Sequence, residues 1–222
     1  MPEVIDHTHP ESLRLQASIG KHKWNGAYYY SKEIVEHFIP NVETDRNWIT
    51  IRAGEVCLDH SIVFVHDIWK FEDKYGYTFP YDDIVYVVSM PDMLERVGKH
   101  GKVVYLPLSV DVPYVEQFRC EKDRKLGFFG RTEWRQNWLQ GAFEFPKGTD
   151  FVGMVPREEL LWTMARYEQA YAVCRTAIEA KILGCEVLPF HPRFPDVSQW
   201  QVIDSRDAAV MLQEKLDAID GR

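Results

Sequence analysis

The chain has 222 residues, of which 45% are hydrophobic and 14% aromatic, so it can bury one large core or two modest ones. Its formal net charge of −8 gives no general attraction for phosphate backbones, so a nucleic-acid partner is not indicated, although it is not forbidden. No run reaches the roughly 18 to 20 apolar residues of a membrane span, and residues 1–10 lack the apolar core of a signal peptide. We therefore expect a cytoplasmic protein without a membrane span.

The four cysteines are scattered along the chain and show no C-x-x-C spacing. No histidine pair accompanies them in the spacing of a zinc site. We expect free thiols in a reducing compartment and no metal site. The residues concerned are Cys57, Cys120, Cys174 and Cys185.

Short β-branched or aromatic runs alternate with helical stretches, a pattern typical of an α/β fold on a mainly parallel sheet. Several runs are continuously apolar, as expected for strands buried on both faces. In chain order, we predict strands at 13–19, 48–52, 61–66, 84–89, 103–106, 126–129, 149–152, 169–173 and 186–190. We predict helices at 28–38, 92–97, 157–166, 176–183 and 207–219.

A domain boundary is expected after the predicted strand 103–106. Pro107 marks a turn there, and a charged stretch, 119–125, precedes the next strand. We therefore expect an N-terminal domain of residues 1–112 and a C-terminal domain of residues 113–222. The last helix has one apolar face and is expected to close the C-terminal end of the fold.

Two segments of the second half carry candidate binding residues. After the strand that ends near Val152, Gly153 either lets a ligand approach the backbone or merely closes the turn to a helix that Pro156 introduces. The helix near Thr176 has two interpretations. In one, Thr176 and Glu179 form a capping box. In the other, the helix N-terminus meets a diphosphate beside Arg175, and Glu179 accepts hydrogen bonds from ribose hydroxyls.

The segment from Arg175 to Val187 resembles the donor-binding half of GT-B glycosyltransferases. That family carries the pattern (small or Arg)-x-(Ala/Leu)-x-Glu-Ala-x-x-x-Gly-x-x-Val, and Glu179, Ala180 and Gly184 are its most specific matches here. Family members commonly have a second glutamate eight residues earlier, where this chain has Tyr171. The resemblance covers roughly residues 60 to 190, and it implies two Rossmann-like halves with a reduced N-terminal half.

The resemblance also implies a set of residues that contact the donor. Leu126-Gly-Phe-Phe-Gly-Arg131 is similar to the first strand of the donor domain, where arginine meets the donor phosphates because its planar fork matches phosphate oxygens. The alternative for Arg131 is a solvated surface arginine. The expected donor-binding residues are Gly130, Arg131, Arg135, Gly153, Met154, Arg175, Thr176 and Glu179.

The N-terminal half matches the family more weakly. The strand ending at His66 resembles one that ends near the sugar, which implies a sugar contact for His66 and a catalytic base at Asp67 if the reaction inverts the anomeric centre. Asn25 and Gly26 lie in a loop similar to the one that borders acceptor and sugar. Nearby aromatic residues either stack on a sugar or base or pack in the core; they are Trp24, Tyr28, Tyr29 and Tyr30.

From this resemblance we expect a metal-independent transferase that moves a sugar from a nucleotide diphosphate sugar to an unidentified hydroxyl acceptor. The nucleotide sugar is a co-substrate, and no other cofactor is expected. By analogy with small phage enzymes, which act in the host cytoplasm, the acceptor could be a modified DNA base. The alternatives are a non-catalytic nucleotide-sugar binding module and a nucleotide-sugar epimerase of the same fold.

Overall fold

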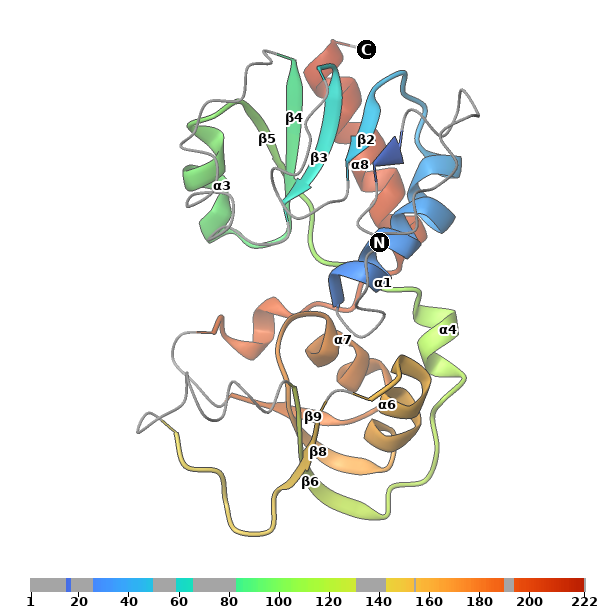
Figure 1. Cartoon of the computed structure of the whole chain (residues 1–222), viewed down its shortest axis with the longest axis vertical. Helices are drawn as coiled ribbons and strands as arrows, with labels where there is room; N and C mark the ends of the chain where they lie inside the picture. The colour runs from blue at the N-terminus through green and yellow to red at the C-terminus, as the bar shows by residue number, and fades with distance from the viewer. Residues whose placement is uncertain are drawn as a thin grey trace, which may run out of the picture. The chain divides into compact units, whose positions relative to one another are not determined.

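A computed structural model of the chain describes residues 15–16, 26–49, 59–65, 83–130, 143–153, 155–189 and 194–221. The chain divides into two compact units (Figure 1). The first unit comprises Met1–Pro107 and Ser205–Arg222, and the second comprises Leu108–Asp204. Each unit contains a parallel β-sheet with helices, so the predicted α/β class is confirmed.

The first unit is built on a five-stranded sheet in the order β1-β2-β3-β4-β5. All neighbouring strands in it are parallel. The strands are β1 (Leu15–Gln16), β2 (Asn47–Ile49), β3 (Ser61–Val65), β4 (Ile84–Val88) and β5 (Lys102–Tyr105). The helices before α8 are α1 (Gly26–Glu33), the π-helix η2 (Ile34–Phe38), the 3₁₀-helix η3 (Ile39–Asn41) and α3 (Asp92–Gly98).

Both faces of this sheet are covered, which explains the uninterrupted apolar sequences of β3 and β4. One face packs Val63 and Tyr86 against Met93 and Val97 of α3. On the other face, Phe64 is stacked on Trp48, with ring centroids 6.1 Å apart, and meets the edges of Tyr30 and Phe38. Tyr30 is only 2% exposed, so the packing interpretation of this tyrosine is correct.

The C-terminal helix α8 (Ser205–Asp220) belongs to the first unit, and Figure 1 shows it in red beside that unit's sheet. The helix contacts η2 and η3, and its residues Leu212 and Leu216 are buried. The backbone N–H of Glu43 donates to Gln213 Oε1 at 2.6 Å. The structure thus differs from the expected C-terminal domain of residues 113–222, because the apolar face of α8 finds its partner in the N-terminal unit.

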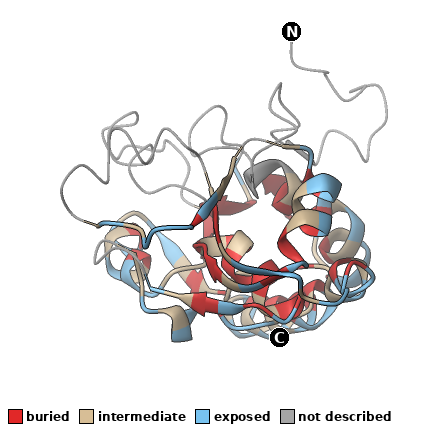
Figure 2. Ribbon diagram, turned by 90° about the horizontal axis from the view of Figure 1, so that it is seen from below, coloured by how far each residue is buried: buried red, intermediate tan, exposed pale blue. Residues whose placement is uncertain are grey.

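The second unit has a four-stranded parallel sheet in the order β7-β6-β8-β9. Its strands are β6 (Arg124–Phe129), β7 (Asp150–Val152), β8 (Tyr167–Tyr171) and β9 (Glu186–Leu188). Its helices are α4 (Val112–Glu116), α6 (Arg157–Met164), α7 (Cys174–Ile182) and the 3₁₀-helix η4 (Val197–Gln199). Figure 2 shows buried residues, drawn in red, in the strands and in parts of the helices.

Every predicted strand and helix overlaps an observed one, whereas α4, η3 and η4 were not predicted. The unit boundary at Leu108 lies close to the expected one at residue 112. Within the described ranges, none of the helices combines the length and apolar character that crossing a membrane requires.

Candidate functional site

Three strand ends meet at the carboxyl edge of the second sheet. Gly130 follows β6, Gly153 follows β7, and α7 follows β8 after two residues. The N–H of Gly130 donates to the carbonyl of Val152 at 3.2 Å, which places the first two ends side by side. Phe128 pairs with Tyr171, so Gly130, two residues beyond this pair, lies at the same end of the sheet as Val173, directly before α7.

This edge contains a topological switch point. The chain leaves β6 toward β7 on one side and then returns to β8 on the other side of β6. The connections that leave the carboxyl ends of β6 and β8 therefore run to opposite sides of the sheet. In open parallel α/β sheets, ligands bind in the crevice outside the strand ends at such a point.

The helix α7 begins two residues earlier than predicted, so Thr176 is not its N-cap. Val173 is the N-cap, and Cys174 has a φ of +53°, in the left-handed region that few non-glycine residues adopt. Gly184 directly follows the C-cap Leu183 and has a φ of +79°, the left-handed conformation in which a glycine commonly ends a helix. The N–H of Cys185 then donates to the carbonyl of Ala180 at 2.9 Å.

Glu179 lies inside the unit and is bound by two arginines. Its Oε1 atom accepts a hydrogen bond from Arg175 Nε at 2.7 Å and lies 2.9 Å from Arg157 Nη2. All three residues are at most 7% exposed. The capping box with Thr176 is therefore not formed, and the ribose contact expected of Glu179 would have to compete with two buried guanidinium groups.

Arg157 was missed as a candidate residue. It begins α6 directly after the N-cap Pro156, and its guanidinium carbon lies 5.3 Å from the ring centroid of Tyr114, within cation–π range. Tyr114 belongs to α4, whose N-cap Asp111 accepts from the Tyr114 N–H at 3.2 Å. The sequence marks Arg157 only as a charged residue at a helix start, because its partners lie far away in the chain.

Tyr171 stands where the resemblance to GT-B glycosyltransferases leads us to expect a second glutamate, and it packs in an aromatic cluster. Its ring meets Phe143 and Phe145 edge to face, with centroids 5.4 and 5.2 Å apart. Burial raises the pKa of its hydroxyl. The side chain at this position therefore serves in packing.

Other expected residues lie outside the part of the chain that the structure describes. They are Asn25, His66, Asp67, Arg131, Arg135 and Met154. Gly26 is described and begins α1. Burial raises the pKa of the Cys174 thiol to about 11, so this cysteine stays protonated at neutral pH and is a poor nucleophile.

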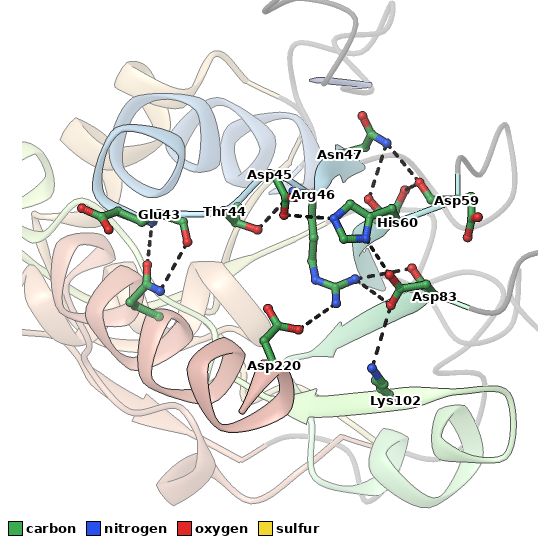
Figure 3. Close-up of polar contacts among 12 residues, drawn as sticks. Glu43, Thr44, Asp45, Arg46, Asn47, Asp59, His60, Asp83, Lys102 and Asp220 are labelled. Atoms are coloured by element: carbon green, nitrogen blue, oxygen red, sulfur yellow. Dashed lines mark hydrogen bonds and ion pairs between the residues drawn. The ribbon is translucent and has the colours of Figure 1, made fainter. Parts of the chain in front are cut away.

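Within the first unit, a polar network occupies the amino edge of the sheet (Figure 3). His60 Nδ1 lies 2.5 Å from Asp83 Oδ2, and His60 Nε2 lies 3.0 Å from Asp45 Oδ1. The buried Arg46 side chain donates to Asp83 at 2.9 Å and to Asp220 of α8 at 2.8 Å. The network ties α8 to the starts of β2 and β4, and we assign it a structural role because ligands of parallel sheets bind at the carboxyl edge.

Hydrogen bonds to Asp83 and then Asp45 raise the pKa of His60. The pKa of Asp83 is lowered, chiefly by its hydrogen bond with His60. Both shifts favour the charged pair.

The fold and the strand-end site define an α/β protein with two parallel sheets, the second of which has a switch point. No protein-family model matches the chain, and no curated protein shows significant similarity to it.

Proposed function

We propose that the protein is a nucleotide-sugar-dependent glycosyltransferase whose second unit binds the diphosphate of the donor. One observation carries this proposal: Gly130, Gly153 and the start of α7 converge at the switch point of one parallel sheet. Backbone without side chains at two strand ends permits close approach of a ligand, and a helix start supplies N–H donors.

The first turn of α7 is suited to a diphosphate. Its N–H groups point out of the helix and carry the positive end of the helix dipole. Thr176 is half-buried in this turn and contributes a hydroxyl donor. We assign direct phosphate contact to Thr176 and to these backbone groups.

Arg175 and Glu179 take modified roles in this proposal. Because Arg175 Nε is bound to Glu179, the guanidinium supplies a fixed positive charge near the helix start. Glu179 holds Arg175 and Arg157 in place and is no longer assigned to the ribose. The positive charge stabilises the negative charge that develops on the leaving diphosphate. Because such groups are already fixed in place, they lower the activation barrier without having to reorganise during the reaction.

The reaction breaks the bond between the anomeric carbon and the diphosphate oxygen and forms a bond from that carbon to the acceptor oxygen. The electron pair of the broken bond leaves with the diphosphate. In an inverting reaction, the acceptor proton would pass to Asp67, the base that the family resemblance implies. His66 would contact the sugar.

Donor binding tests this proposal before any acceptor is known. Thermal shift and calorimetric titration with UDP, GDP, ADP, CMP and dTDP, each with and without a sugar, should reveal at least one saturable ligand. Thr176→Val should weaken its affinity about 10- to 100-fold, the effect of losing a hydrogen bond to a charged group. The matched control is Thr163→Val near the end of α6, at the opposite edge of the same sheet.

Equal loss of affinity in both variants, or no ligand at all, would contradict the proposed site. Binding without any release of nucleoside diphosphate in the presence of acceptors would instead favour the non-catalytic binding module.

A further inference from the structure

A cavity of about 370 Å³ opens at the carboxyl ends of β8 and β9. Val173, the N-cap of α7, lines it on one side, and Pro189, which follows β9, lines it on another. The cavity therefore adjoins the helix start to which the proposed function assigns the diphosphate. All of its lining residues belong to the second unit.

The lining is apolar and rich in aromatic rings. Phe143, Phe194 and Trp200 contribute to it; the two phenylalanines are half-buried, and Trp200 is 3% exposed. A ligand in this cavity meets flat apolar surfaces on several sides. Cavities of this size and character take small organic molecules, and aromatic walls favour a planar ring.

Lys181 of α7 fixes the wall that η4 forms. Its Nζ atom donates to the carbonyl of Val197 at 2.6 Å and to the carbonyl of Trp200 at 2.7 Å. These two bonds hold both ends of η4 against α7. The cavity wall is thus tied to the helix whose start adjoins the cavity.

Among the described residues that line the cavity, Asp196 is the one that carries a charge. Its Oδ1 atom accepts from the N–H of Ser198 at 2.9 Å and caps η4, so the carboxylate is held in place. A carboxylate accepts several hydrogen bonds and donates none. It repels a phosphate and attracts a ring edge that carries N–H groups.

We infer that this cavity binds the base of the donor nucleotide and that the base is guanine. Guanine presents a ring N–H and an exocyclic amino group side by side, which matches a carboxylate bidentately. Uracil and thymine present a single N–H between two carbonyl oxygens, and adenine and cytosine place a ring acceptor beside the amino group. The inference rests on the proposed function for the position of the diphosphate, whereas the cavity itself does not depend on it.

Calorimetric titration with GDP, guanosine, UDP and uridine tests the assignment. The wild-type protein should bind GDP at least about tenfold more tightly than UDP, and guanosine more tightly than uridine. Asp196→Asn keeps an oxygen able to cap η4, because asparagine caps as well as aspartate. It should remove the preference for guanine. The control is Asp207→Asn, which changes an exposed aspartate on α8 in the first unit.

A second variant, Phe194→Leu, removes a ring from the cavity wall. It should lower the affinities for guanosine and for GDP by similar factors. Equal affinity for GDP and UDP, or an unchanged preference in Asp196→Asn, would overturn the base assignment. If Thr176→Val still weakens nucleotide binding in that case, the proposed function would remain supported although the base assignment fails. If Asp196 is needed for guanosine binding but the diphosphate of GDP adds no affinity, the assignment of the base pocket would hold. The proposed transferase function would then be contradicted.

Discussion

Arg157 and Glu179 lie 22 positions apart in the sequence and form an ion pair of 2.9 Å inside the second unit. Their side chains are 7% and 3% exposed. The pair joins the start of α6 to the middle of α7. Since both helices begin at the carboxyl edge of the sheet, this contact fixes the two helix starts that border the proposed diphosphate site.

Removal of Glu179 should destabilise the second unit. Glu179→Ala leaves two buried guanidinium groups without this carboxylate, so the free energy of unfolding should fall by about 3–5 kcal/mol. Glu179→Gln keeps an acceptor oxygen and should cost less. Urea denaturation measures both, with Glu214→Ala on the exposed side of α8 as the control. A loss in Glu179→Ala no larger than that of the control would show that the buried cluster does not stabilise the fold.

The His60 network predicts a pH-dependent contribution to the stability of the first unit. The pKa of His60 is raised, so its contribution is fully present below its unfolded pKa of about 6.5 and is lost as the pH rises through the folded value. The pKa of Asp83 is lowered, so its contribution is present above about 3.8 and is lost as the pH falls through its folded value. The network should therefore be strongest between about pH 4 and 6.5.

His60→Asn tests this window, because asparagine tolerates the φ of +53° at this position but carries no charge. The variant should be less stable than the wild type by at most about 1 kcal/mol at pH 5 to 6, because the His60 side chain is 42% exposed. The difference should disappear by about pH 9. Urea denaturation at intervals of one pH unit would show it, and a difference that does not vary with pH would argue against a charged His60.

Because α8 packs in the first unit, the stability of that unit should depend on this helix. Leu212 is fully buried, and Leu212→Ala should cost about 2–5 kcal/mol. Val210 on the same helix is 57% exposed, so Val210→Ala is the matched control and should change stability by less than about 0.5 kcal/mol.

Hydrogen exchange followed peptide by peptide separates the two units. In Leu212→Ala, protection should fall in peptides from β2 to β5 and remain in peptides from β6 to β9. The reverse pattern would assign α8 to the second unit.

The sequence predicts most of the elements of this fold because parallel strands buried on both faces are uninterrupted apolar runs. β3 and β4 are the clearest cases, with all ten residues buried. The sequence does not indicate α4, which has only five residues and no amphipathic repeat. Nor does it assign α8 to a unit, because an apolar helix face shows that a helix packs but does not show against what.

Three of the candidate segments lie together at one sheet edge, whereas their detailed contacts differ from the expectation. Gly130, Gly153 and the start of α7 are found at one sheet edge because strand ends of a parallel sheet meet there. The start of α7 was misplaced because a non-glycine residue, Cys174, adopts a left-handed φ that sequence patterns do not reveal. The pairing of Glu179 with Arg157 depends on tertiary contact, so local spacing favoured the capping box with Thr176.

Release of nucleoside diphosphate from a nucleotide sugar tests the central claim most directly. The protein should release GDP from a GDP-sugar in a time-dependent and saturable reaction, and Thr176→Val should lower kcat/KM about 10- to 100-fold while Thr163→Val leaves it unchanged. Release that is absent for every nucleotide sugar in the presence of hydroxyl acceptors, or that Thr176→Val and Thr163→Val affect equally, would contradict the account.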